Sequence, residues 1–151
     1  METITIERTI AAPITDVFDW VTNSHNYTRL WPVLHEHLQT PGEDAPYGLD
    51  AVRVVFCVGA CFWERITAYS APHSFEYHID RSFPPLIHEG GRVAFTETPE
   101  GTHVLWVTTA ELRFPIPAVA EFLTRAVIRP VLTYSFGRIL DIAARELTKP
   151  A

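Results

Sequence analysis

In several segments between Thr3 and Phe114, apolar residues recur at every second position, which is the spacing of a half-buried β-strand. The segment from Thr3 to Ile10 shows it most clearly, because its isoleucines alternate with threonines and a glutamate. Proline- and glycine-containing turns separate the later segments. The pattern predicts seven mostly antiparallel strands, over residues 3–10, 34–39, 50–58, 61–69, 74–81, 91–98 and 102–114.

The stretch after the first strand has a helical pattern instead. Pro13 at the first turn and Asp16 close behind it are favourable at a helix start. A second short helix is expected to end at Pro32. The apolar residues of the first short helix are Val17, Phe18 and Val21.

The last element predicted is a long helix from Pro117 to Leu147. Its apolar residues form one broad stripe at helical spacing, and charged residues occupy the opposite face. Pro130 lies inside this segment, so the helix is expected to kink or break there.

Composition narrows the class of protein. The chain has 151 residues, 47% of them hydrophobic, which suits one domain over residues 1–151 with a substantial core. Its net charge of −6 argues against nucleic acid as a partner. Charged residues interrupt the apolar stretch in the last third, so no membrane span is expected. Because the N-terminus lacks a secretory leader pattern, a cytoplasmic location is expected.

Metal ligands and cofactors are not expected. Cys57 and Cys61 form a C-x-x-x-C pair, which is a weak zinc signal without further ligands. We interpret them as small apolar residues of a buried strand pair. His35 and His37 share a strand face, but no third ligand is predictable beside them.

Four pieces of the sequence carry a family resemblance. They are the segment from Ala12-Pro13 to Trp31-Pro32, the segment from Trp63 to Thr67, Glu100-Gly101-Thr102 with Val104 and Trp106, and the long terminal helix. Together they resemble the START-related superfamily, which includes polyketide cyclases, birch-pollen-type allergens and lipid carriers. The polyketide cyclase/dehydrase branch is the most similar.

The resemblance implies an α+β helix-grip fold. In that fold a seven-stranded curved antiparallel sheet wraps around a long C-terminal helix, here kinked, with two short helices after the first strand. A hydrophobic small molecule binds in the cavity between sheet and helix. The partner implied is therefore a hydrophobic, aromatic or polyketide-like molecule.

Candidate ligand-binding residues follow from the strand and helix periodicity. An aromatic set can point inward and form walls for a flat apolar ligand. Each member has an alternative role as an ordinary core residue. The candidates are Trp31, Trp63, Tyr77, Phe95, Trp106, Phe122 and Phe136, with the hydroxyls of Thr67 and Thr133.

Four residues are candidates for catalysis. Arg65 shares strand parity with Trp63, and Arg129 adjoins Pro130, so either guanidinium can stabilise an enolate if it faces the cavity. Tyr69 or His35 is expected to move protons. The alternative for the arginines and the histidine is a solvent-facing position.

The resemblance and the sequence differ at one point. Aromatase/cyclases of this branch hold their poly-β-keto chain with a cavity arginine on the fourth strand. That position falls on Tyr69 here, while the nearest arginine on the strand is Arg65. Glu64 alternates away from the face that we expect to point inward.

The leading hypothesis is binding of a hydrophobic, aromatic or polyketide-like molecule, with cyclisation or dehydration as its chemistry. The first alternative is a non-catalytic carrier or sensor for a lipid or other apolar metabolite. The second is an interaction module, such as a homodimer, that uses the apolar segment from Phe83 to Ile87.

Overall fold

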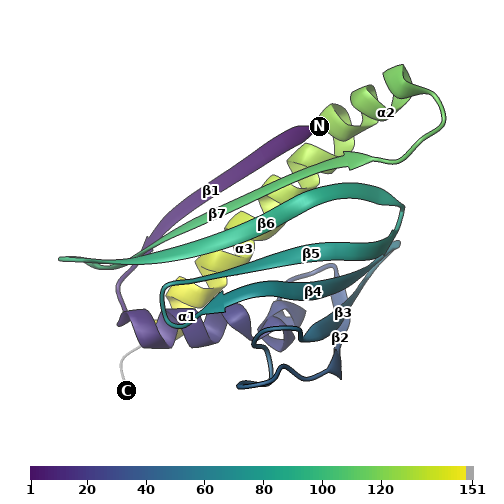
Figure 1. Ribbon diagram of the computed structural model, residues 1–151. Coiled ribbons are helices and arrows are strands. Elements are labelled where there is room, and N and C mark those ends of the chain that lie inside the picture. The colour runs from purple at the N-terminus through teal and green to yellow at the C-terminus, as the bar shows by residue number, and fades with distance from the viewer. Residues whose placement is uncertain (149–151) are drawn as a thin grey trace.

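The computed structural model describes residues 1–148 and shows a seven-stranded antiparallel sheet that curves around a long C-terminal helix (Figure 1). The strand order is β1-β7-β6-β5-β4-β3-β2, so the first and last strands of the chain are neighbours at one edge. This arrangement confirms the predicted helix-grip fold. The strands are β1 (Glu2–Ile10), β2 (Val33–Thr40), β3 (Val52–Cys57), β4 (Ala60–Ser70), β5 (Ser74–Phe83), β6 (Leu86–Thr98) and β7 (Gly101–Leu112).

Two short helices follow β1, as predicted: α1 (Ile14–Thr22) and the 3-10 helix η1 (Ser24–Arg29). Pro13 precedes α1 with an extended backbone, which is the conformation of a residue before a helix. The Asn23 side chain accepts a hydrogen bond of 3.1 Å from the backbone N–H of His25 and so caps η1. Tyr27 of η1 is buried, and its ring lies 6.2 Å from that of Trp106 on β7.

The C-terminal helix begins at Pro117 and is continuous in three parts, α2 (Pro117–Leu123), η2 (Thr124–Ile128) and α3 (Arg129–Leu147). The part η2 is a π-helical turn, closed by a hydrogen bond from the Arg129 N–H to the Thr124 carbonyl. It lies directly before Pro130, which has no N–H to continue an α-helical ladder. The interruption predicted at this proline is confirmed. In the described residues, no helix has the length and apolar character that a membrane crossing requires.

An aromatic part of the core lies where α1 packs on the sheet. Phe18 is fully buried and packs edge-on against Phe75 and Phe95, with ring centroids 6.2 and 5.1 Å apart. Leu140 and Ala143 of α3 are also fully buried. Because side chains fill this end of the sheet, any space for a ligand lies toward the other end.

The prediction of which β4 side chains point inward is wrong in the middle of the strand, where Arg65 was expected inside and Glu64 outside. Thr67 is an extra residue relative to β5, since Ile66 pairs with Tyr77 and Ala68 with Glu76. Before this bulge the inward residues of β4 are Phe62, Glu64 and Ile66. A bulge shifts the alternation by one position, so Tyr69 turns inward again and packs on Phe18. Apolar residues occur at both odd and even positions of β4, so the sequence pattern alone does not show which face of the strand is buried.

Candidate functional site

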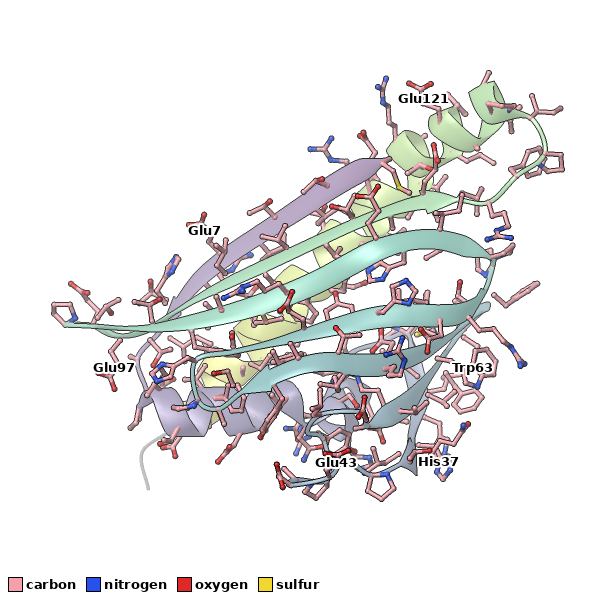
Figure 2. All side chains as sticks on the ribbon, in the orientation of Figure 1. Glu7, His37, Glu43, Trp63, Glu97 and Glu121 are labelled. Atoms are coloured by element: carbon pink, nitrogen blue, oxygen red, sulfur yellow. The ribbon has the colours of Figure 1, made fainter. Side chains whose placement is uncertain are left out.

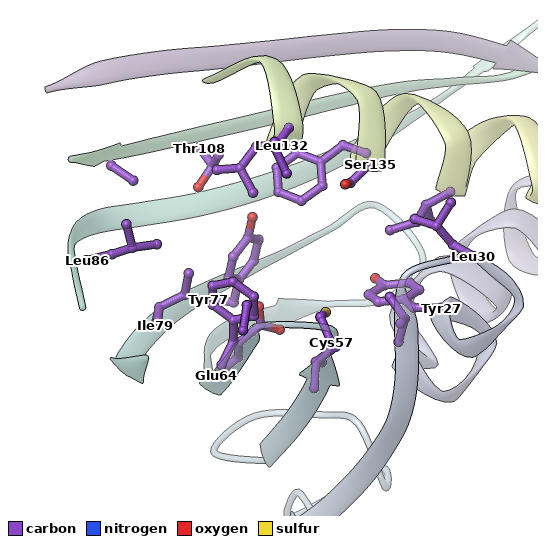
Figure 3. Close-up of a pocket in the computed structure, with 18 of the residues that line it drawn as sticks. Tyr27, Leu30, Cys57, Glu64, Tyr77, Ile79, Leu86, Thr108, Leu132 and Ser135 are labelled. Carbon is purple, nitrogen blue, oxygen red and sulfur yellow. The ribbon is translucent and has the colours of Figure 1, made fainter. Parts of the chain in front are cut away.

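A cavity of about 170 Å³ lies between the sheet and α3, at the end of the sheet away from α1 (Figure 3). Strands β3 to β7 form its floor, α3 covers it, and η1 closes one side. Its lining residues are Tyr27, Leu30, Pro32, Val33, Arg53, Val55, Cys57, Val58, Ala60, Phe62, Glu64, Tyr77, Ile79, Leu86, His88, Trp106, Thr108, Ala110, Val131, Leu132, Ser135, Phe136 and Ile139.

Apolar side chains dominate these walls. The indole of Trp106 and the ring of Phe136 stack with centroids 4.2 Å apart, so they join β7 to α3. Val58 at the β3–β4 turn and Val131 on α3 line the cavity and are exposed to solvent. The mouth of the cavity therefore lies between this turn and the helix.

The volume limits the ligand. Drug-sized ligands occupy pockets of roughly 300–1,000 Å³. An engineered apolar cavity of about 150 Å³ binds benzene. At about 170 Å³, the cavity in this state has room for a compact molecule of about one ring rather than for a long acyl or polyketide chain.

The cavity contains a buried ion pair formed by Arg53 and Glu64. These residues are direct partners in the β3–β4 register. The Arg53 Nε donates to the Glu64 Oε1 over 2.8 Å, and their side chains are only 1% and 14% exposed. The Arg53 Nη1 also donates to the Thr22 carbonyl over 3.3 Å, which supplies a partner at the C-terminal end of α1.

Aromatic rings complete the surroundings of this guanidinium. It lies 5.5 Å from the ring centroid of Tyr27, and 5.8 Å from those of Phe75 and Tyr77. Burial works to lower the pKa of Arg53, but the adjacent Glu64 carboxylate outweighs it and raises that pKa above its ordinary value. The pair is thus a fixed charge couple in the floor of the cavity.

A second polar group is a chain of hydrogen bonds that starts at the backbone of β5. The Ile79 N–H donates to the His88 Nδ1 over 3.0 Å, so the neutral imidazole carries its proton on Nε2. This Nε2 lies 2.7 Å from the Thr108 Oγ1 and donates to it. Burial, and secondarily the nearby His78, lower the pKa of His88 to about 4, so the ring stays neutral near pH 7.

The Tyr77 hydroxyl lies beside this chain. The Trp106 Nε1 donates to the Tyr77 oxygen over 2.9 Å. Burial raises the pKa of Tyr77 above its ordinary value, and hydrogen bonds to its oxygen from Thr108 and Trp106 oppose the rise. Because an indole N–H only donates, the Tyr77 O–H proton remains available to a molecule in the cavity. Figure 3 shows Tyr77 extending from β5 toward the helix that carries Leu132 and Ser135.

The other titratable groups of the cavity also stay neutral. Burial raises the pKa of Tyr27 to about 12. Burial, with smaller effects from Glu64 and Cys61, raises the pKa of the Cys57 thiol to about 11. A thiol with this pKa is a poor nucleophile at neutral pH, so Cys57 contributes surface rather than covalent chemistry. Both cysteines are free and half-buried.

Three of the sequence-predicted residues line the cavity together. Tyr77 comes from β5, Trp106 from β7 and Phe136 from α3. Phe95 is buried in the core against Phe18 instead. Tyr69 also packs on Phe18, and burial raises the pKa of its hydroxyl.

The two predicted catalytic arginines lie on the outer surface. Arg65 forms an ion pair with Asp80 over 3.0 Å on the face of the sheet opposite to α3. Arg129 forms an ion pair with Glu2 at 3.0 Å, beside the start of β1. Their expected inward orientation is wrong, because each guanidinium finds a carboxylate partner in solvent.

The remaining candidates also lie outside the cavity lining. The His35 ring on β2 is exposed and lies 5.7 Å from the ring of Phe56. Neither residue lines the cavity, so His35 is not at the cavity mouth. The indole of Trp63 stacks with Arg81 at 4.1 Å and points away from the sheet in Figure 2. Thr67 is exposed at the β4 bulge. The exposed candidates after η1, on α2 and on α3 are Trp31, Phe122 and Thr133.

The two exposed aromatic candidates, Trp31 and Phe122, are 72% and 67% exposed, so neither contributes a wall to the cavity. Thr133 donates to the Arg129 carbonyl one turn earlier, which satisfies its hydroxyl within the helix. In the segment proposed for dimerisation, Phe83 is exposed whereas Leu86 lines the cavity, so the segment is not one continuous patch.

Sequence reasoning missed Arg53, Glu64 and His88. Arg53 is a lone charge within the apolar run A-V-R-V-V-F, and such a charge in a strand needs a buried partner. That signal was available in the sequence. The partner was not, because the β3–β4 register depends on the turn at Gly59, which has a φ of 77°. Among residues 1–148, no group of three or more side chains has the arrangement of a metal site.

Comparison with solved structures supports the fold. The di-domain ARO/CYC BexL from the BE-7585A biosynthetic pathway has a TM-score of 0.77 and 21% identity, over 99% of this chain and 51% of that one, so this chain spans about half of BexL. TTHA0849 from Thermus thermophilus has a TM-score of 0.73 and 16% identity, over 97% of each chain. A START superfamily protein from Mycobacterium smegmatis has a TM-score of 0.64 and 11% identity, over 93% of this chain and 98% of that one.

Among curated proteins, no sequence matches the chain. The family described as polyketide cyclase / dehydrase and lipid transport matches residues 1–148. The resemblance noted from the sequence is therefore confirmed, and the chain belongs to the polyketide cyclase/dehydrase and lipid transport family.

Proposed function

We propose that this protein binds a compact hydrophobic molecule of aromatic or polyketide-like type in the cavity and dehydrates or cyclises it by proton transfer. The family and the START-like fold support binding of a hydrophobic ligand. The observation that carries the chemical part is the pairing of an anchored carboxylate, Glu64, with an available hydroxyl, Tyr77, in one apolar cavity.

Binding rests on the apolar walls and one directed hydrogen bond. The stacked Trp106 and Phe136 rings offer a flat surface at one side of the cavity. The Tyr77 O–H is available to donate to a ligand carbonyl. A small number of placed polar groups in an apolar pocket is the usual way to orient a ligand.

Dehydration of a β-hydroxy ketone illustrates the chemistry. Tyr77 donates to the carbonyl oxygen and stabilises the enolate as it forms. The Glu64 carboxylate removes the α-proton and delivers it to the departing β-hydroxyl, which leaves as water. The products are an enone and water, and Glu64 returns to its starting state. Arg53 acts as a positioning residue here, because it holds one oxygen of the carboxylate.

Turnover of a compact probe tests the proposal. Diacetone alcohol is a small β-hydroxy ketone, and its dehydration to mesityl oxide is followed by ultraviolet absorbance of the conjugated product. We expect the wild type to accelerate it, and the variants Tyr77→Phe and Glu64→Gln each to lose about a hundredfold of that acceleration. The matched control is Tyr134→Phe, which removes an exposed hydroxyl on α3 and is expected to retain the wild-type rate.

Binding is measured separately by titration calorimetry with acetophenone. Tyr77→Phe is expected to weaken acetophenone binding, because the hydrogen bond to the ketone is lost. Absence of acetophenone binding by the wild type would contradict the proposed ligand site. Equal dehydration rates for the wild type and Glu64→Gln would contradict the role of the carboxylate.

Carriage without chemistry is the second candidate function. It is favoured by one observation: the Glu64 Oε1 already accepts a hydrogen bond from Arg53 over 2.8 Å, so this oxygen is occupied before a ligand enters. Tight acetophenone binding together with no acceleration of diacetone alcohol dehydration is the result that selects this candidate.

A further inference from the structure

The charges inside the cavity sum to zero. Among the described lining residues, Arg53 and Glu64 alone belong to the Asp, Glu, Lys and Arg types, and they pair with each other at 2.8 Å. The hydrogen bond that the His88 Nδ1 accepts from Ile79 keeps that ring neutral. The shifted pKa values of Tyr27 and Cys57, about 12 and about 11, keep their hydroxyl and thiol protonated.

The guanidinium of Arg53 is also held by other groups of the protein. Its Nε donates to Glu64 and its Nη1 to the carbonyl of Thr22. Three aromatic rings surround it, with centroids between 5.5 and 5.8 Å away. The side chain is 1% exposed and lies in the cavity floor against Glu64, so a ligand meets a paired charge rather than a free cation.

From this geometry we infer that the cavity selects electrically neutral ligands and rejects carboxylates, including fatty acids, of the same size and shape. The inference rests on the proposed function, because it concerns the ligand of the same cavity. It specifies the substrate class as a compact neutral molecule that accepts a hydrogen bond from Tyr77 and donates one to Glu64, such as a hydroxy ketone, an enol or an amide.

The physical reason is desolvation. A carboxylate that enters this cavity exchanges water for apolar walls and becomes the one charge without a counter-ion, at a cost of several kcal/mol. It also approaches Glu64, which has the same sign and is held in place by Arg53. A neutral carbonyl compound avoids both penalties and still receives the Tyr77 hydrogen bond.

Benzamide and benzoate are a suitable pair of probes. They have nearly the same shape, and both have a single ring, which suits a cavity of about 170 Å³. Benzamide offers a carbonyl acceptor and an N–H donor, whereas benzoate carries a negative charge and has no donor. Titration calorimetry on the full chain is expected to show that the wild type binds benzamide roughly tenfold or more tightly than benzoate, which corresponds to about 1.4 kcal/mol.

The variant Glu64→Gln is expected to reverse this preference. It removes the carboxylate but retains a side chain of similar shape, so the Arg53 charge in the cavity is no longer compensated. Benzoate should then bind more tightly than benzamide. The matched control is Glu97→Gln, which changes charge equally at the β6–β7 end of the sheet, as Figure 2 shows, and should keep the wild-type preference.

A second variant tests the charge argument even if the single variant Glu64→Gln does not fold. The double variant Arg53→Met with Glu64→Gln has a cavity without charges on these two residues, so it should prefer benzamide as the wild type does. Circular dichroism establishes that each variant is folded before titration. The wild-type comparison decides the main point even if neither variant folds.

The possible failures are distinguishable. If the wild type binds benzoate as tightly as benzamide, charge selection is overturned while the proposed ligand site stands. If Glu64→Gln folds and still prefers benzamide, the role given to Glu64 in the selection is overturned. If the wild type binds neither benzamide nor benzoate nor acetophenone, the proposed function is overturned, and this inference with it.

Discussion

Glu64 and Arg65 are neighbours on β4, and each is one half of an ion pair of nearly the same length. On the concave side of the sheet, Glu64 meets Arg53 at 2.8 Å, with side chains 14% and 1% exposed. On the convex side, Arg65 meets Asp80 at 3.0 Å, and both side chains are 42% exposed. Two pairs of equal chemistry thus lie on opposite faces of one strand.

The difference between these pairs lies in their surroundings. Water and salt screen the outer pair, so it gains little from its Coulomb attraction. The inner pair has lost its water, so each charge depends on the other and on a few fixed hydrogen bonds. An arginine–carboxylate pair in the sequence therefore says little about stability or function until its burial is known.

The largest effect is expected when the inner pair is broken. Arg53→Leu leaves the Glu64 carboxylate in the cavity without its counter-ion and should lower the free energy of unfolding by about 3–5 kcal/mol. Urea denaturation followed by circular dichroism measures the change. A loss no greater than that of the outer variant Arg65→Leu would contradict the contrast drawn between the two faces.

Removing the second charge should restore much of that loss. Adding Glu64→Leu to Arg53→Leu replaces an unpaired carboxylate by an apolar side chain, and we expect a recovery of about 2–4 kcal/mol. The same denaturation experiment completes a double-mutant cycle. If the double variant is no more stable than Arg53→Leu, the loss comes from packing around Arg53 and not from the unpaired charge.

The two histidines near this site extend the comparison to pH. His88 is buried with a pKa of about 4, whereas His78 is half-buried and lies 2.7 Å from Asp80 on the outer face. Between its ordinary pKa of 6.5 and about 4, His88 binds a proton in the unfolded chain but not in the folded one. Stability must therefore fall as pH drops through this window, because the unfolded state gains the proton first.

Because of His88, the free energy of unfolding is expected to fall by about 2 kcal/mol as the pH drops from 6.5 to 4, after allowance for some screening by water. Urea denaturation at several pH values gives the slope of the free energy of unfolding against pH, and the effect of His88 is the difference in this slope between the wild type and His88→Gln. His78→Gln is the matched control and should keep most of the wild-type slope. If the slope for His88→Gln is identical to that of the wild type, His88 is not the cause of this pH dependence.

The smallest effect is expected at the outer pair. Arg65→Leu removes a solvent-screened ion pair and should change the free energy of unfolding by less than about 1 kcal/mol. Raising the salt concentration should reduce even this difference. A loss of several kcal/mol would mean that the outer pair has a structural role that its exposure does not suggest.

Much of the fold followed from local patterns. The alternation in β1, the proline and aspartate at the start of α1, and the helical stripe after Pro117 each depend on residues close together in the chain. The interruption at Pro130 was equally local, because it arises from the missing N–H of one residue. Such features need no knowledge of the partner strand or of the opposite layer.

The site was predicted only in part. Tyr77, Trp106 and Phe136 were expected to point inward and do so, because they occur in regular stretches of strand and helix. Arg65 was expected inside and lies outside, while Glu64 was expected outside and lies inside. The β4 bulge at Thr67 and the matching irregularity at Asp80 shift the alternation in a way that no short sequence window shows.

By itself, the sequence determined the elements, their order and the family, since periodicity and turn residues act over a few positions. Only the tertiary structure decided which charges meet inside the cavity. The partners Arg53 and Glu64, and the chain from Ile79 through His88 to Thr108, depend on strand register across the sheet. Register is set jointly by turns, bulges and burial across the whole sheet, so residue types alone do not reveal it.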